Sequence, residues 1–168
     1  MIVVYTGEGK GKTSAALGQV IRALGHGLRV ACVQFMKRDG VAGEQRILKQ
    51  LLQDDFLAGG LGFFRDRKEY PRHRAASLEA LNWAREKVAS GVQVCILDEA
   101  ICALHQGLIL AQELKDMLQT AATHGAHVVL TGRDAPNWLV EQADIVTEMA
   151  CRKHHFSGGQ TAVRGMEY

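Results

Sequence analysis

A glycine-rich segment near the start of the chain contains residue types that bind phosphate. Residues 6–13 have the sequence TGEGKGKT, and the residues after them have the apolar spacing of a helix. Glycines allow backbone N–H groups to turn inward as a concave nest, and a helix N-terminus adds about half a positive charge. Lys12 would contact the outer phosphates of a nucleotide, and the Thr13 hydroxyl would bind a magnesium ion that bridges them. The segment therefore predicts a site for a polyphosphate chain.

The segment departs at one position from the usual phosphate-loop pattern, G-x-x-x-x-G-K-[ST]. Thr6 stands where the pattern has its first glycine, although Gly7 and Gly9 keep the loop permissive. The alternative is a glycine turn without a ligand, but a bare turn needs neither two lysines nor a hydroxyl at these offsets. The residues predicted to bind the nucleotide are Thr6, Gly7, Glu8, Gly9, Lys10, Gly11, Lys12, Thr13 and Ser14.

A pair of acidic residues, Asp98 and Glu99, follows an apolar run at residues 92–97 that is typical of a buried strand. If that strand lies beside the first one, a carboxylate at its end can reach the magnesium ion of a nucleotide, directly or through water. The alternative is an acidic cap that only improves solubility. Together with the phosphate loop, the pair predicts that Thr13, Asp98 and Glu99 bind Mg²⁺ or Mn²⁺.

The elements that must position these residues alternate along the chain between apolar runs and segments with helical spacing. This alternation predicts an α/β fold of the P-loop (RecA-like) class, a single domain over residues 1–168 with a mostly parallel sheet and helices on both faces. The predicted strands are residues 2–5, 28–35, 92–97, 126–131 and 145–149, and the predicted helices are residues 13–24, 44–53, 71–90, 108–123 and 135–142.

Two segments leave alternatives open. Phe63 and Phe64 begin an aromatic and basic run, residues 63–68, for which we predict a strand. The two rings are either core residues with a solvated rim or a platform for a flat ligand. Arg133 follows the strand at residues 126–131, where it either caps the edge of the sheet or pairs with Asp134, or else contacts a phosphate or another part of the ligand.

The composition disfavours several classes of protein. The 20 lysines and arginines nearly balance 18 acidic residues, for a net charge of +2, so we expect no nucleic-acid or membrane partner. No apolar stretch reaches ~18 residues and no signal-peptide pattern is present, which predicts a soluble, cytoplasmic protein. The four cysteines form no C-x-x-C pair, so we expect no disulfide framework.

Several of these segments together resemble one known family, the CobA/CobO/BtuR-type ATP:corrinoid adenosyltransferases. The similarity covers nearly the whole chain, in the family's order. The segments are TGEGKGKT, GFFRDRK, CILDE, VVLTGRDAPNWLVEQADIVTEM and GMEY. The resemblance implies transfer of the 5′-deoxyadenosyl group of ATP to a corrinoid whose cobalt has been reduced to Co(I), with release of inorganic triphosphate.

The resemblance also implies roles for individual residues and for partners. Lys12 would be catalytic because its charge stabilises the departing triphosphate, and Glu99 because it holds the metal that does the same. Phe63, Phe64 and Arg65 would bind the corrinoid. Many family members have a tryptophan where this chain has Arg65. Displacement of the lower cobalt ligand is assigned first to Phe63, which aligns with a family phenylalanine, and the departure at Arg65 leaves Phe64 as the alternative. Family members are commonly homodimers, and an electron-donating reductase or flavoprotein must reduce the cobalt.

Two other functions are compatible with the residues alone. A P-loop ATPase or kinase would transfer the γ-phosphoryl group of ATP, with Glu99 acting on water. A carrier would bind a corrinoid or nucleotide without turnover, although it would not need a metal-binding Thr13 and an acidic pair. The products distinguish these functions, because triphosphate supports adenosyl transfer, whereas ADP supports an ATPase or kinase.

Overall fold

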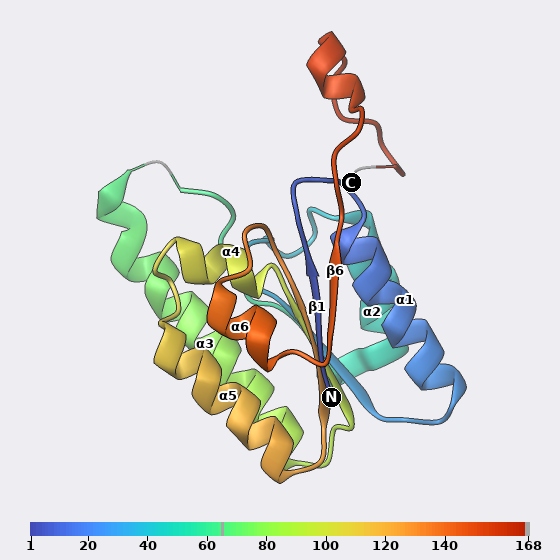
Figure 1. Ribbon diagram of the computed structural model, residues 1–168, viewed down its shortest axis with the longest axis vertical. Coiled ribbons are helices and arrows are strands. Elements are labelled where there is room, and N and C mark those ends of the chain that lie inside the picture. Colours follow the sequence, from blue (N-terminus) through green and yellow to red (C-terminus); the bar gives the residue numbers. More distant parts are fainter. Residues whose placement is uncertain (65, 167–168) are drawn as a thin grey trace.

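One parallel sheet of six strands forms the centre of the molecule (Figure 1). The computed structural model describes residues 1–64 and 66–166. Neighbouring strands run parallel in the order β3-β2-β4-β5-β1-β6. The strands are β1 (Ile2–Thr6), β2 (Val30–Gln34), β3 (Phe56–Ala58), β4 (Val94–Asp98), β5 (His127–Thr131) and β6 (Ile145–Glu148). The sheet confirms the predicted α/β class.

Helices cover both faces of the sheet, as predicted (Figure 1). One face carries α1 (Lys12–Gly25) and α2 (Gly43–Leu52). The other carries α3 (Tyr70–Ala89), α4 (Ala100–His105), α5 (Ala111–Thr123) and α6 (Asn137–Gln142). Three short 3₁₀ segments are η1 (Gln53–Asp55), η2 (Arg67–Glu69) and η3 (His155–Gly158).

Alternation along the strands divides the core into two parts. In β1, Val4 packs with Leu97 and Leu130 beneath α3 and α5, whereas Val3 and Tyr5 face the cluster beneath α1 and α2. This is the period of two that a strand buried on both faces requires. The two cores fix the twist and spacing of the strands, and thereby the positions of the loops at their carboxyl ends.

The strand order corrects one prediction about the acidic pair. Strand β4, which ends at Asp98, does not lie beside β1, because β5 pairs with both of them. The apolar runs of the strands are alike, so the sequence pattern did not reveal which strands pair. One consequence is that Asp98 lies next to Thr131, the last residue of β5.

The strand predicted at residues 63–68 is wrong. The third strand in the chain is the shorter β3, and residues 61–64 have no regular secondary structure. Gly60 passes so close to β2 that a Cβ on it would lie 2.4 Å from the carbonyl oxygen of Phe35, and Gly62 has a φ of 85°. These two glycines turn the chain away from the sheet before Phe63.

The chain beyond β6 leaves the body of the molecule, and Figure 1 shows it projecting past the carboxyl ends of the strands. It contains η3 and several exposed side chains, including Phe156 and Met166. Within residues 1–64 and 66–166, no helix has the length and apolar character needed to span a bilayer.

Candidate active site

The loop between β1 and α1 is held in place by the backbone that follows β6. Gly9 donates its N–H to the carbonyl oxygen of Met149 at 2.5 Å, and a Cβ on Gly9 would lie 2.5 Å from that same oxygen. Gly7 and Gly11 have φ angles of 94° and 111°, which L side chains rarely adopt. The loop therefore needs glycine at these positions, and the contact with Met149 holds its backbone in one conformation before a ligand binds.

The side chain of Lys12 folds over this loop. Its Nζ donates hydrogen bonds to the carbonyl oxygens of Gly7 at 2.6 Å and Gly9 at 2.7 Å. Burial, followed by the nearby Arg133 guanidinium, lowers the pKa of the Lys12 ammonium. Among the described residues the partly desolvated Lys12 ammonium donates to carbonyl oxygens, so it would gain from the approach of a phosphate oxygen.

Arg133 pairs with the phosphate loop and not with its sequence neighbour. Its Nη1 lies 3.0 Å from Glu8 Oε2, and both side chains are about 60% exposed. The sequence had left pairing with Asp134 open, whereas the ion pair found for Arg133 within the described residues is with Glu8. An exposed ion pair contributes ~0–1 kcal/mol, so a bound anion could displace Glu8 at small cost.

The Asp98 carboxylate is fully buried and accepts four hydrogen bonds. Its Oδ1 accepts from Thr13 Oγ1 at 2.9 Å and from Thr131 Oγ1 at 2.7 Å. Its Oδ2 accepts from Gln34 Nε2 at 3.0 Å and from the Lys37 ammonium at 3.1 Å. Burial of a carboxylate is costly unless hydrogen bonds and an opposite charge compensate for it, and Asp98 has both. The result is a rigid link between the phosphate loop and the ends of three strands.

Lys37 also contacts Glu44 in the first turn of α2, with a distance of 2.9 Å between Nζ and Oε1. Burial is the largest influence on the pKa of Lys37 and lowers it, but the attraction of Asp98 and the hydrogen bond to Glu44 outweigh burial, so the pKa is raised. Lys37 is therefore charged, and it is held between two carboxylates.

Glu99 is strained and has an unpartnered oxygen. Its φ is 61°, and its backbone N–H donates to Thr131 Oγ1 at 2.8 Å. Its Oε2 is buried and has no hydrogen-bond partner among the described residues. Burial, followed by repulsion from Asp98, raises the pKa of its carboxyl group. Such strain and such an orphaned acceptor are typical of functional sites.

The donor set around these carboxylates fits a magnesium ion. Mg²⁺ prefers hard oxygen ligands and retains several waters, so one or two carboxylates and a hydroxyl suffice. The Thr13 hydroxyl and the orphaned Glu99 oxygen are the groups that a metal would satisfy. Asp98 already accepts four hydrogen bonds, which suits it to orienting the Thr13 hydroxyl.

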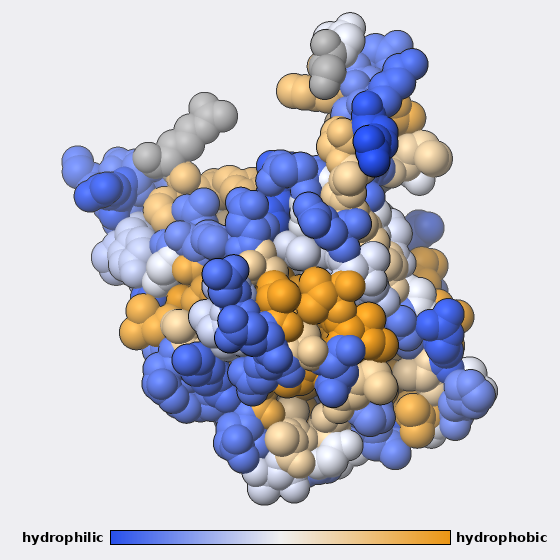
Figure 2. Space-filling view, in the orientation of Figure 1, coloured by the Kyte–Doolittle hydropathy of each residue, from blue (hydrophilic) through white to orange (hydrophobic). Residues whose placement is uncertain are grey.

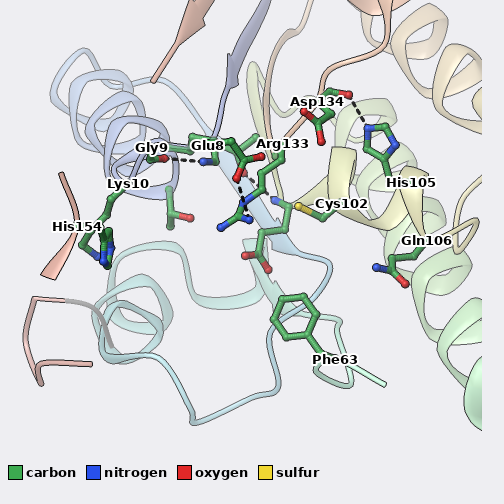
Figure 3. A pocket seen from close by; sticks show the side chains of 15 residues that line it. Glu8, Gly9, Lys10, Phe63, Cys102, His105, Gln106, Arg133, Asp134 and His154 are labelled. Carbon is green, nitrogen blue, oxygen red and sulfur yellow. Dashed lines mark hydrogen bonds and ion pairs between the residues drawn. The ribbon is translucent and has the colours of Figure 1, made fainter. Parts of the chain in front are cut away.

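A cavity of about 560 Å³ joins the phosphate loop to the aromatic segment. Figure 3 shows the ring of Phe63 across this cavity from Glu8 and Arg133. The Phe63 side chain is 73% exposed, so its apolar ring is available to a ligand. A second hollow of about 460 Å³ lies on the other side of Lys12, Thr13 and Glu99, where Ser14, Lys37 and Glu44 border it.

The other predicted site residues take different positions. The ring of Phe64 packs on His73, with centroids 4.6 Å apart, and does not line the main cavity. It borders a neighbouring hollow together with His105 and Gln106. The Thr6 hydroxyl accepts a hydrogen bond from the N–H of Ala135 at 3.1 Å. Arg65 lies outside the described residues.

The sequence reasoning missed one whole wall of the cavity. Helix α4 was not predicted, and it brings Cys102, His105 and Gln106 to the site, the last from just beyond its end. It also missed Gln34, which donates a hydrogen bond to Asp98, and Thr131, which accepts one from the backbone N–H of Glu99. Their signal was a buried polar residue at the end of an otherwise apolar strand.

Comparison with known proteins gives consistent similarities. A family model described as "ATP:corrinoid adenosyltransferase BtuR/CobO/CobP" matches residues 1–168. A corrinoid adenosyltransferase of Pseudomonas aeruginosa is 37% identical, over 100% of this chain and 83% of the relative. A corrinoid adenosyltransferase of Sinorhizobium sp. is 36% identical, over 100% of this chain and 80% of the relative. One from Escherichia coli (strain K12) is 34% identical, over 100% of this chain and 85% of the relative.

Among solved structures, the genome packaging NTPase B204 from Sulfolobus turreted icosahedral virus 2, in complex with AMP, has a similar fold. The match has a TM-score of 0.53 and 13% identity, and covers 91% of this chain and 76% of that one. At this identity the likeness concerns the fold alone, and it agrees with the predicted P-loop class.

Proposed function

Because this chain belongs to the family of ATP:corrinoid adenosyltransferases, we propose that it transfers the 5′-deoxyadenosyl group of ATP to the cobalt of a reduced corrinoid. One observation supports this function more than any other. A single cavity has a phosphate-binding loop on one side and an exposed aromatic ring, Phe63, on the other. Such a cavity suits a reaction between a nucleotide and a large flat partner.

In the proposed reaction, the nucleophile is the substrate cobalt and not a side chain. Co(I) donates an electron pair to the ribose 5′ carbon, which forms the cobalt–carbon bond. The bond between that carbon and the α-phosphate oxygen breaks, and its electrons leave with inorganic triphosphate. The protein therefore needs no general base, and it acts by orienting the two substrates and stabilising the leaving group.

The cations around the loop suit a leaving group that gathers negative charge. The Lys12 ammonium lies over the loop, Lys10 borders both hollows, and Arg133 faces the main cavity. The backbone N–H groups of the loop and the N-terminus of α1 add fixed dipoles. These groups do not reorganise as charge develops, which is the basis of electrostatic catalysis.

We assign the metal site to Thr13, Asp98 and Glu99. When bound there, Mg²⁺ or Mn²⁺ would neutralise charge on the triphosphate oxygens. Thr13 and Glu99 would offer it oxygen ligands, while Asp98 would keep the Thr13 hydroxyl oriented through their 2.9 Å hydrogen bond.

The corrinoid would lie against Phe63. By the family resemblance, an apolar side chain at this place displaces the lower ligand of cobalt, and four-coordinate Co(II) is easier to reduce. The exposed ring of Phe63 suits this role, whereas Phe64 is engaged by His73 and Tyr70. Arg65 stands where many members have tryptophan, and we propose that it contacts the corrinoid periphery.

We further propose a cytoplasmic homodimer that receives electrons from a reductase or flavoprotein. Strand β6 is an edge of the sheet, and its side chains are exposed. Figure 2 shows an apolar area on the face that carries β6 and α6, where Val140, Ile145 and Val146 are each 39–44% exposed. An exposed apolar edge strand is suited to pairing with another strand, here that of a second copy.

The test of the proposed function is formation of a cobalt–carbon bond. The protein is mixed with Mg-ATP and chemically reduced cobalamin or cobinamide, and the corrinoid absorbance is followed in a single turnover. We expect the spectrum of an alkylated corrinoid at a rate that depends on protein concentration. Failure with both corrinoids would reject the proposal.

A further inference from the structure

The ammonium group of Lys37 is a fixed cation beside the residues assigned to the metal. Its Nζ lies 2.9 Å from Glu44 Oε1, 3.1 Å from Asp98 Oδ2 and 3.4 Å from Thr13 Oγ1. Thr13 and Asp98 both belong to the proposed metal site. The chain itself therefore supplies a positive charge at the acidic end of the nucleotide site.

The surroundings of Lys37 hold it in this position. The side chain of Gln45 is buried, and its Nε2 donates to the carbonyl oxygen of Arg38 at 3.0 Å and to Gln34 Oε1 at 2.9 Å. Gln34 in turn donates to Asp98 at 3.0 Å. Arg38, which follows Lys37, and Asp98, which Lys37 contacts, thus belong to one hydrogen-bonded network. The ammonium is preorganised and not a mobile surface charge.

The same position brings Lys37 close to any metal on Thr13. Mg²⁺ binds oxygen at ~2.1 Å, so an ion on Thr13 Oγ1 would lie no more than about 5.5 Å from Nζ. At this separation, in a partly buried site, the repulsion between a dication and an ammonium group is substantial. The negative charge of a triphosphate would offset that repulsion, because its oxygens can lie between the two cations.

We propose that the Lys37 ammonium is a built-in cation that keeps divalent metal ions from binding at Thr13, Asp98 and Glu99 until a nucleoside triphosphate brings additional negative charge. The metal then enters with the nucleotide and not before it. This inference rests on the proposed function for the location of the metal site, and it adds an order of binding. The alternative is that Lys37 only neutralises the buried Asp98, with no effect on metal binding.

The test measures Mn²⁺ binding to the protein without nucleotide, from the electron paramagnetic resonance signal of free Mn²⁺. We expect Lys37→Met to bind Mn²⁺ about tenfold more tightly than the wild type, or better, because the acidic residues lose their internal cation. The matched control is Lys49→Met, since Lys49 pairs with Asp39 on the surface. This control should bind as the wild type does. Adding Asp98→Asn to Lys37→Met should remove the gain.

The outcomes separate this inference from the proposed function. Equal Mn²⁺ affinity for the wild type and folded Lys37→Met would overturn the inference, even if the wild type transfers the adenosyl group. Tighter binding by Lys37→Met, with no adenosyl transfer by the wild type, would support the inference and reject the proposed function. If circular dichroism shows that Lys37→Met is unfolded, Lys37→Gln and Lys37→Arg replace it. The inference then requires tighter binding by the glutamine variant, and equal binding overturns it.

Discussion

The hydroxyl of Thr13 donates a hydrogen bond to Asp98 Oδ1 at 2.9 Å, although the two residues are 85 positions apart in the chain. Thr13 lies in the first turn of α1, and Asp98 ends β4, which β5 separates from β1. Thr131 of the intervening strand donates to the same oxygen at 2.7 Å. The Asp98 carboxylate therefore connects the start of α1 to the end of β4, although β5 lies between β4 and β1 in the sheet.

Removal of the Lys12 ammonium should slow the reaction. Lys12→Ala deletes a preorganised cation that lies over the loop, and such a loss costs about 100-fold or more in rate. The rate is measured in a single turnover with saturating Mg-ATP and Co(I) corrinoid. Lys49→Ala is the control, because Lys49 pairs with Asp39 on the surface. An unchanged rate in Lys12→Ala would show that the loop does not act on the leaving group.

Glu99→Gln should raise the concentration of magnesium that the reaction needs. The amide has nearly the same size as the carboxyl group but offers a metal no charge, and the buried Oε2 has no hydrogen bond to lose among the described residues. We expect the Mg²⁺ concentration that gives half the maximal rate to rise about tenfold or more. Chelation of the metal with EDTA should bring both proteins to the same low rate. Coincident magnesium curves would remove Glu99 from the metal site.

Phe63→Ala should impair a reaction that starts from Co(II) more than one that starts from Co(I). The proposed role of the ring is to displace the lower ligand, a step that is needed only before reduction. Phe156→Ala is a matched control, since that ring is 72% exposed in the chain beyond β6 and Phe63 is 73% exposed. The two starting states are compared as a ratio of rates. An equal loss from both would assign Phe63 a packing role only.

Phe64, the residue after Phe63, should contribute to the free energy of unfolding. Phe64 packs against His73 and the apolar core, so we expect Phe64→Ala to lower the free energy of unfolding by about 1–3 kcal/mol. Phe63→Ala should change it by less than about 0.5 kcal/mol, because its side chain is largely exposed. Urea unfolding of both variants measures the difference, and the opposite ranking would contradict these positions.

Asp55 should make stability depend on acid pH. The hydrogen bond from Arg29 is the main cause that lowers the pKa of Asp55, and Lys87 adds to it. Because the pKa is lower in the folded protein, the stabilisation is complete above the unfolded value, about 4. It is lost as the pH falls through the folded value. Its size should be at most about 1 kcal/mol.

The measurement compares urea unfolding at pH 7 and pH 3 for the wild type and Asp55→Asn. The variant should lose less stability between these two pH values, since its amide does not titrate. Asp54→Asn changes an exposed neighbour and should keep the wild-type difference. An unaltered difference in Asp55→Asn would show that this ion pair does not respond to acid.

The sequence predicted the elements whose signal is long and regular. The apolar runs that became β1 and β4 and the spacing that became α3 are examples. It failed at short elements, because β3 has three residues and α4 has six, too few for a periodic pattern. It also failed at strand order, which depends on how the two cores fill and not on any local run of residues.

The candidate site was predictable where one segment carried its own signal. The glycines of residues 6–13 were enough to predict a phosphate loop. The structure adds the reason for two of them, since a Cβ on Gly7 or Gly9 would clash with the backbone of Met149. The acidic network was not predictable, since it joins Gln34, Lys37 and Thr131 from three separate segments around Asp98. Phe63 and Phe64 look alike in sequence, but the structure exposes the ring of Phe63 and packs that of Phe64 against His73 and Tyr70.

The most direct test of the account follows the oxygen atom between the ribose 5′ carbon and the α-phosphorus. ATP labelled with ¹⁸O at this position is incubated with the protein, Mg²⁺ and Co(I) corrinoid, and the products are analysed by mass spectrometry. Attack at carbon predicts that all of the label leaves in inorganic triphosphate. Recovery of the label in ADP or AMP, with free phosphate or diphosphate as the other product, would show attack at phosphorus and contradict the account.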